Sequence, residues 1–174
     1  MKLIESGAIA DLNWHFGNQT DETSQSKNVI LPFEIFLARP ELAPELAPEL
    51  ARGVQVGVDT NIDELRPHLD KLALIVIEFS AYADGRGFSI AHRLRHSLGY
   101  QGKIWGSGSL IADQYALAVQ CGVDAVLVEE ELLERQPIDQ WQEALASAPV
   151  PYRYQVDMIQ NQPVSEPVET LSSP

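Results

Sequence analysis

The chain has 174 residues, 45% of them hydrophobic and 21% charged, which is enough for one well-buried core. A net charge of −13, from 12 basic and 25 acidic residues, argues against binding to the phosphate backbone of nucleic acid. No segment reaches the roughly 18 apolar residues of a membrane-spanning helix, and the single cysteine excludes an internal disulfide. We therefore expect a cytoplasmic protein with neither nucleic acid nor membrane as a partner.

The first 28 residues predict an N-terminal hairpin followed by a mobile loop. Two short apolar segments, Lys2–Ile4 and Ala8–Leu12, are separated by a glycine that suits a hairpin turn. From Asn18 to Asn28 the chain is polar and has no apolar periodicity. The next segment, Val29–Leu37, predicts a short strand that runs into a helix, with Pro32 near the helix start.

A tandem repeat follows, in which Pro-Glu-Leu-Ala begins at Pro40, Pro44 and Pro48. Proline at every fourth position removes hydrogen bonds that a helix needs, so we predict an irregular loop over residues 40–51. An expanded surface loop is favoured over a recognition segment, because insertions in surface loops cost little free energy.

Beyond this loop, apolar runs alternate with helical patterns. The predicted strands are Val54–Val58, Leu72–Ile77, Lys103–Gly106 and Asp124–Val128, and the predicted helices are Thr60–Leu69, Phe88–Leu98, Leu110–Gln120 and Ile138–Ala146. This order indicates an α/β fold of repeated βαβ units with a mostly parallel sheet. The chain is too short for a complete (β/α)8 barrel, so a partial TIM-barrel-like sheet or an open sheet remains.

We expect a single α/β domain over residues 29–156, ending in an edge strand at Tyr152–Val156. Residues 157–174 are rich in proline, serine and glutamate, a composition typical of a disordered tail.

The turn Asp84–Ser89 joins a predicted buried strand to a predicted helix, the edge of an α/β sheet where ligands bind. Backbone amides of Gly85 and Gly87, with Ser89, are candidate ligand-binding groups at a helix N-terminus. Arg86 can bind sulfite, sulfate, phosphate or a carboxylate. Asp84 is a candidate catalytic base, or it holds Arg86 in place. In the alternative interpretation, Asp84 caps the helix and Arg86 is a solvated surface charge.

The turn Gly106–Ser109 occupies the equivalent place one unit later. Gly108 and Ser109 are candidate ligand-binding residues, with Gln114, and Asp113 is a candidate catalytic residue. Alternatively Ser109 is an N-cap and Asp113 complements the helix dipole. Because neighbouring parallel strands end at one edge of the sheet, we expect the two turns to lie close together.

The remaining reactive side chains predict no metal site. Cys121 is alone and is expected to be a buried structural thiol. His92 and His96 lie four residues apart on one predicted helix face, without a third ligand, and are expected to be solvated.

Several of these segments follow in a familiar order. The chain resembles the bacterial domain-of-unknown-function family 934 from about Val29 to Tyr154, through the segments Asp84-Gly-Arg-Gly-Phe-Ser, Leu94-Arg95, Leu98-Gly99-Tyr100, Gly102, Gly108, Asp113-Gln114 and Cys121-Gly122-Val-Asp124-Ala125. The resemblance implies a small cytoplasmic proteobacterial protein whose gene accompanies assimilatory sulfite reductase. Members are labelled as oxidoreductases of sulfite reduction on the basis of that gene association.

The chain departs from the family pattern at two positions. Trp105 stands where members usually carry arginine, and Ser109 stands where they carry an acidic residue. If those charges belong to an active site, the site of this chain is altered.

Three hypotheses about function follow. The first is an enzyme or accessory of sulfite assimilation, in which Arg86 holds the anion while Asp84 and Asp113 orient it or handle protons. The second is a non-catalytic protein that docks on sulfite reductase or its electron donor. The third is a flavin or nicotinamide enzyme, although no dinucleotide fingerprint or cysteine pair supports it, and the cofactor stays unassigned.

Overall fold

The computed structural model describes residues 1–17, 28–38 and 51–148. In this part of the chain eight strands form one sheet in the order β2-β1-β8-β7-β6-β5-β4-β3. The strands are β1 (Lys2–Glu5), β2 (Ala8–Ala10), β3 (His15–Phe16), β4 (Asn28–Pro32), β5 (Ala51–Gly57), β6 (Leu74–Phe79), β7 (Lys103–Gly108) and β8 (Ala125–Val128). Strands β3 to β8 are parallel, while β1 is antiparallel to both β8 and β2.

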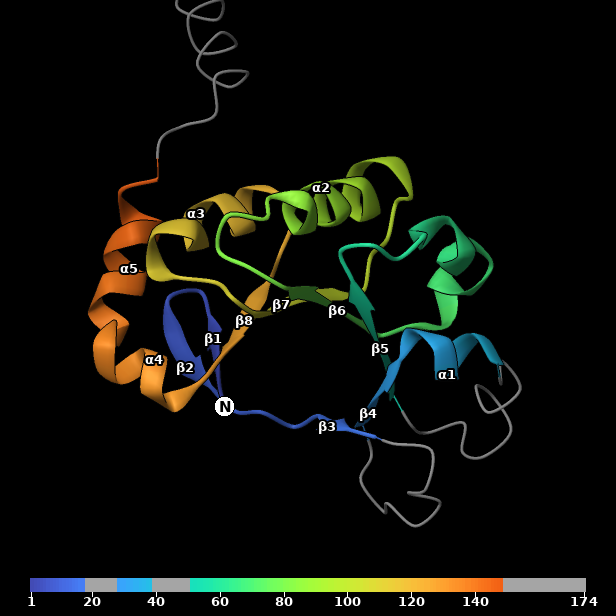
Figure 1. The fold of residues 1–174 in the computed structure, drawn as a ribbon, viewed down its shortest axis with the longest axis horizontal. Helices are drawn as coiled ribbons and strands as arrows, with labels where there is room; N and C mark the ends of the chain where they lie inside the picture. The colour runs from blue at the N-terminus through green and yellow to red at the C-terminus, as the bar shows by residue number, and fades with distance from the viewer. Residues whose placement is uncertain (18–27, 39–50, 149–174) are drawn as a thin grey trace, which may run out of the picture.

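The sheet curls into a half-barrel, and the helices cover its outer face (Figure 1). The helices are α1 (Phe33–Ala38), the 3-10 helix η2 (Ile62–Lys71), α2 (Arg86–His92), the π-helix η3 (Arg93–Ser97), α3 (Ala112–Gln120), α4 (Glu130–Arg135) and α5 (Ile138–Ala146). The predicted α/β class with a mostly parallel sheet is thus confirmed, and it takes the form of a partial barrel in one domain. None of the helices in the described residues is long and apolar enough to cross a membrane.

Alternation along the strands separates two hydrophobic cores. On β6, Ile75 and Ile77 face the helices and join the larger core, which also contains Trp141 of α5. Leu74 and Val76 point to the concave face and join a smaller core. The period of two along a strand therefore lets one apolar run fill both sides of the sheet.

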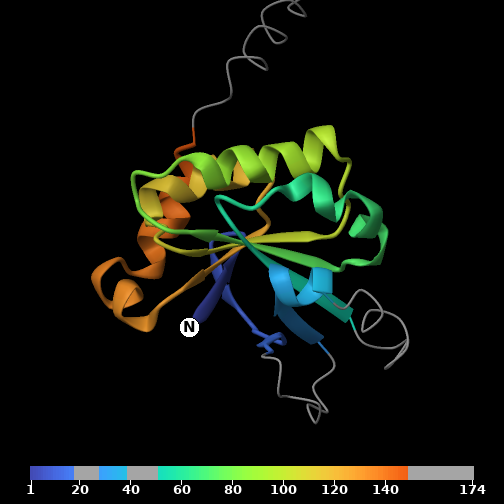
Figure 2. The same ribbon diagram turned by 45° about the vertical axis from the view of Figure 1, so that its right-hand side comes forward.

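The N-terminal segment closes the open side of the half-barrel. Between the edge strands β2 and β3, the chain crosses the concave face (Figure 2), and Leu12 and Trp14 pack on the smaller core there. The ring of Trp14 meets that of Trp105 edge to face, with centroids 6.2 Å apart and an interplanar angle of 77°. Trp105 is 5% exposed, so this position belongs to the concave core.

Some expected elements differ in the structure. The segment predicted as a helix from Thr60 to Leu69 forms the 3-10 helix η2. Asn61 is its N-cap residue, and it contains Pro67, which has no N–H to donate. Strand β7 continues to Gly108, because its ladder with β6 extends to the pair Phe79 and Gly108. Strand β3 and helix α4 were not predicted.

Other expectations lie wholly or mostly outside the described residues. The edge strand Tyr152–Val156 and the tail over 157–174 lie wholly outside. Of the loop over 18–28 only the last residue is described, in β4, and of the Pro-Glu-Leu-Ala loop over 40–51 only the last residue is described, in β5.

Candidate functional site

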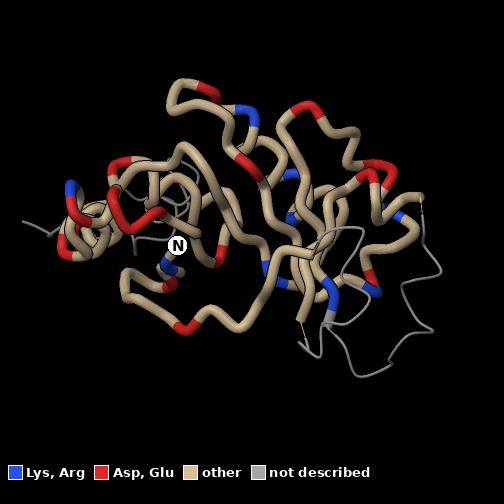
Figure 3. The backbone as a smooth tube through the Cα atoms, turned by 60° about the horizontal axis from the view of Figure 1, so that its bottom comes forward, with Lys and Arg blue, Asp and Glu red and all other residues tan. Residues whose placement is uncertain are grey.

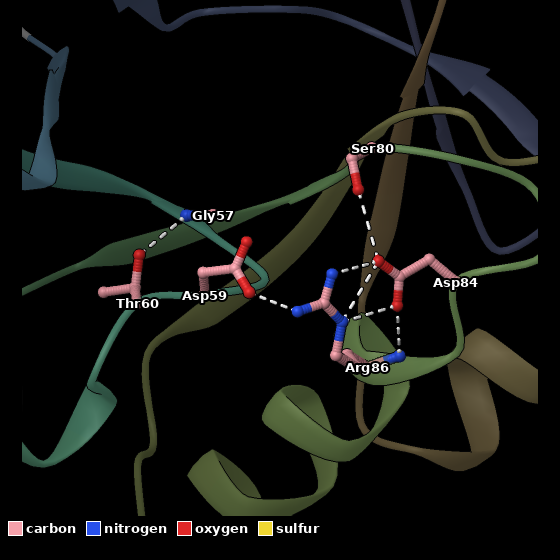
Figure 4. Close-up of polar contacts among 6 residues, drawn as sticks. All are labelled: Gly57, Asp59, Thr60, Ser80, Asp84 and Arg86. Atoms are coloured by element: carbon pink, nitrogen blue, oxygen red, sulfur yellow. Dashed lines mark hydrogen bonds and ion pairs between the residues drawn. The ribbon is translucent and has the colours of Figure 1, made fainter.

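The candidate site lies at the edge where the parallel strands end. Strand β5 ends at Gly57, and Asp59 follows two residues later. Strand β6 ends at Phe79 and is followed by a loop that carries Ser80 and Asp84, before α2 begins at Arg86. Figure 4 shows that the loops after β5 and β6 face each other across the Arg86 side chain.

Arg86 is bound from two sides. Its Nε donates to Oδ1 of Asp84 at 2.9 Å, and its Nη2 donates to Oδ2 of the same carboxylate at 2.7 Å. Its Nη1 pairs with Oδ1 of Asp59. Ser80 Oγ supports Asp84 by donating to Oδ2 at 3.3 Å, and the Arg86 backbone N–H donates to Oδ1 at 3.1 Å (Figure 4). The structure thus brings Asp84 and Arg86 together as a fork-to-carboxylate pair.

The charges in this cluster favour one protonation state. Hydrogen bonds from Arg86 lower the pKa of Asp84 from 3.8 to about 2, and hydrogen bonds to Asp84 and Asp59 raise the pKa of Arg86. Asp84 is therefore ionised at neutral pH and a poor proton acceptor. Its geometry matches the role of holding Arg86, and its Oδ1 also accepts the Arg86 backbone N–H, although Gly85 is the N-cap residue of α2. With two carboxylates around one guanidinium, the cluster carries a formal charge of −1.

The glycines of this turn differ in what surrounds them. Gly87 is buried, and a Cβ atom there would lie 2.5 Å from the Phe79 ring. Its lack of a side chain is explained by close packing of α2 on β6, without any ligand. Gly85 is exposed, and its nearest neighbour would be a ring carbon of Phe88 at 4.0 Å. Ser89 is exposed in the first turn of α2.

The second predicted turn is hydrogen-bonded to the end of β6. Gly108 has a φ of 84°, and a Cβ atom there would lie 2.5 Å from the Phe79 carbonyl oxygen. The Ser109 N–H donates to that oxygen at 2.8 Å, and Ser109 Oγ donates to the Ser80 carbonyl at 3.4 Å. The expected N-cap at Ser109 is wrong, because α3 starts later and Ile111 is the N-cap residue.

Gln114 joins the two turns, whereas Asp113 faces away from them. Gln114 Nε2 donates to the Tyr82 carbonyl at 2.7 Å, while its Oε1 is buried without a hydrogen-bond partner among the described residues. Asp113 is exposed and lines a groove between α3 and α5, opposite Glu143. The structure therefore gathers the predicted residues of both turns except Asp113.

Comparison with known proteins places the chain in a family. A family model described as "Bacterial protein of unknown function (DUF934)" matches residues 53–165, more than half of the chain. The chain belongs to this family. A search of the curated proteins found no match. The description of DUF934 assigns no reaction, so the function of this member has to be argued from its own residues.

Sequence reasoning missed Asp59 and Tyr82 in this DUF934 protein. Asp59 follows β5 as Asp84 follows β6, so the rule that ligands bind where parallel strands end was the available signal. Tyr82 lies in the loop after β6 and is 53% exposed. It stands between Ala81 and Ala83, so nothing in the surrounding sequence indicated this exposure.

The other candidate groups of this family member are uninvolved in the site. His92 and His96 are exposed, with ring centroids 4.4 Å apart, and no cluster of three or more metal-ligating side chains occurs in the described residues. Cys121 is partly buried against the larger core. Burial raises the pKa of its thiol, which agrees with a structural thiol.

Proposed function

We propose that this DUF934 protein is a cytoplasmic accessory of assimilatory sulfite reduction that docks, through residues 80–86, on a protein of that system. The observation that carries the docking role is the exposure of Tyr82, in the loop after β6, and of Arg86, at the start of α2. Their exposed fractions are 53% for Tyr82 and 55% for the Arg86 side chain. Tyrosine and arginine are the residue types enriched among binding hot spots. The sulfite pathway rests on the resemblance of the motif series.

The loop is held in shape before any partner arrives. Gln114 binds its backbone at Tyr82, Ser109 binds it at Ser80, and Asp84 closes it onto the start of α2. A loop that is already ordered loses little conformational entropy on binding. This supports a docking surface on residues 80–86 rather than a segment that folds on contact.

The Arg86–Asp59 contact suits exchange with a partner. The Asp59 side chain is 83% exposed, and exposed ion pairs contribute little stability. A carbonyl oxygen of a partner, which carries no net charge for Asp84 to repel, can therefore replace Asp59 at Nη1 at small cost, while Asp84 keeps the guanidinium in place. Figure 3 shows acidic positions spread over the described chain and outnumbering the basic ones, so a partner with a positively charged surface would be attracted to it.

A second candidate is binding of a small anion at the same arginine. Sulfite, sulfate or phosphate would have to displace Asp59 from Nη1, and the exposure of Asp59 favours that exchange. Asp84 would remain bound to the other side of Arg86, and its negative charge would repel the anion. Docking therefore ranks above anion binding.

The test is a binding titration of the purified full chain against purified components of the assimilatory sulfite reductase system. Tyr82→Ala and Arg86→Ala should each weaken docking by about tenfold or more. Arg66→Ala is the matched control, because Arg66 is 63% exposed on η2 and pairs with Asp63 at 3.7 Å. Absence of binding by the wild-type chain, or equal losses for all three variants, would reject docking through this loop.

The same preparations separate the other hypotheses. Calorimetry with sodium sulfite, sulfate and phosphate tests the anion site, where Arg86→Ala should abolish any heat that the wild-type chain gives. An absorbance scan of the protein as purified tests for a bound flavin.

A further inference from the structure

The outer surface of the molecule has an open groove between helices α3 and α5. The two helices pack side by side (Figure 1), and the groove between them has a volume of about 410 Å³. The alanines of its lining, Ala116, Ala144 and Ala148, are more buried than the other lining residues. Because these side chains are short, a segment of another protein can approach both helices closely.

An exposed leucine lies beside this groove on α3. Leu117 directly follows the lining residue Ala116, and it is 46% exposed. It comes four residues after Asp113, which also lines the groove, and three residues after Gln114. Residues at these spacings are neighbours on a helix surface, so Leu117 lies between the groove and the side of α3 that carries Gln114.

Leu117 also adjoins the loop that we propose for docking. Gln114 Nε2 donates to the Tyr82 carbonyl at 2.7 Å, which holds the loop against the first turn of α3. Tyr82 and Leu117 are therefore two large hydrophobic side chains, 53% and 46% exposed, on adjoining parts of one surface. Single exposed apolar side chains are common, whereas neighbouring ones beside a groove indicate a protein-binding surface.

The charged residues of the groove are all acidic. Asp113 of α3 and Glu143 of α5 line it from opposite sides, and both are exposed. Among the described residues, no lysine or arginine pairs with either carboxylate, and the lining contains no basic residue. The complementary surface of a partner is therefore basic.

We propose that the groove and Leu117 receive an amphipathic segment of the docking partner, in which lysine or arginine lies beside apolar side chains. The basic side chain would pair with Asp113 and Glu143, and the apolar side chains would cover Leu117 and the alanines of the lining. This inference rests on the proposed docking function and adds the chemistry of the partner. Residues 80–86 and the groove would then form one continuous interface.

The experiment is the binding titration of the full chain against purified components of the assimilatory sulfite reductase system. Leu117→Gln should weaken docking about tenfold, whereas Leu117→Met, which keeps an apolar side chain of similar volume, should bind like the wild type. Glu143→Gln should weaken docking several-fold. Glu143→Lys should weaken it more, by about tenfold or more, because it places a like charge against a basic partner. Both positions are exposed, and circular dichroism should show the variants folded.

Glu134→Gln and Glu134→Lys are the matched controls. Glu134 is exposed on α4 and lies outside the groove lining, so these variants change the net charge equally and should leave docking nearly unchanged.

The outcomes separate this proposal from docking through residues 80–86. If Leu117→Gln and Glu143→Lys bind like the wild type while Tyr82→Ala binds more weakly, the groove proposal is rejected and docking through the loop stands. The groove proposal is also rejected if Glu143→Lys binds more tightly than the wild type, or if Glu134→Lys weakens docking as much as Glu143→Lys does. Absence of binding by the wild-type chain rejects both proposals.

Discussion

Replacing Arg95 by lysine should destabilise the protein strongly although it preserves the charge. The guanidinium joins three backbone carbonyls and Asp124 through hydrogen bonds of 2.5 to 3.0 Å. A lysine ammonium is a single point donor and cannot reach these four acceptors together. The variant therefore loses at least two hydrogen bonds at a position where the arginine side chain is only 19% exposed.

The expected loss follows from those contacts. With about 1–2 kcal/mol for each hydrogen bond that leaves a partly buried acceptor unpaired, Arg95→Lys should lower the free energy of unfolding by about 2–4 kcal/mol. That is a large share of the roughly 5–15 kcal/mol that stabilises a typical domain. The midpoint of thermal unfolding should fall by roughly 4–16 °C.

Urea unfolding followed by circular dichroism measures this difference, with Arg93→Lys as the control. Arg93 lies two residues earlier and pairs with Asp63 at 2.5 Å, but its side chain is 49% exposed. Its replacement should cost less than about 1 kcal/mol. If both variants lose the same free energy, the hydrogen bonds of Arg95 to the backbone do not stabilise this edge as we infer.

Three further predictions concern the candidate site and the thiol. Gly87→Ala should lower the free energy of unfolding by about 1–3 kcal/mol through overpacking. Gly85→Ala, whose added Cβ would meet only a Phe88 ring carbon at 4.0 Å, should change that free energy by less than about 0.5 kcal/mol; equal unfolding midpoints in urea would contradict this. The pKa of Asp84 is about 2 in the folded protein, compared with the ordinary aspartate value of 3.8. The ionised carboxylate therefore stabilises the fold above pH 3.8, and this contribution is lost as the pH falls toward 2. Nuclear magnetic resonance titration of Arg86→Met should show the Asp84 pKa returning toward 3.8, and an unchanged value would refute the assignment. Cys121, whose pKa is raised by burial, should react with a disulfide reagent more slowly than free cysteine at pH 8, and equally fast labelling would argue against burial of the thiol.

The fold was predictable from the sequence wherever a single apolar run corresponds to a single strand or helix. The run from Leu72 to Ile77 predicted β6 because strands buried on both faces are continuously apolar. The segment that crosses the concave face between β2 and β3 was not predictable. Strand β3 has only two residues, and the partial burial of Trp14 depends on its contact with the Trp105 ring of β7. Helix α4 has six residues, too few to show a helical period.

The site was predictable only within one βα unit. Asp84 and Arg86 are two residues apart, so the sequence alone suggested that the Asp84 carboxylate holds the Arg86 side chain in place. Asp59 lies 27 positions before Arg86, and only the pairing of β5 with β6 brings it near. The second turn was placed two residues early, because nothing in its small residues indicates that the β6–β7 ladder continues through Gly106.

The two arginines at either end of the same helical segment differ in what they can recognise. Arg95 donates to backbone carbonyls and Asp124 and is largely buried, whereas Arg86 has one exposed partner that can be exchanged. Recognition at the edge where the strands end therefore falls to Arg86. Arg86→Ala should therefore weaken docking, whereas Arg95→Lys should lower the free energy of unfolding.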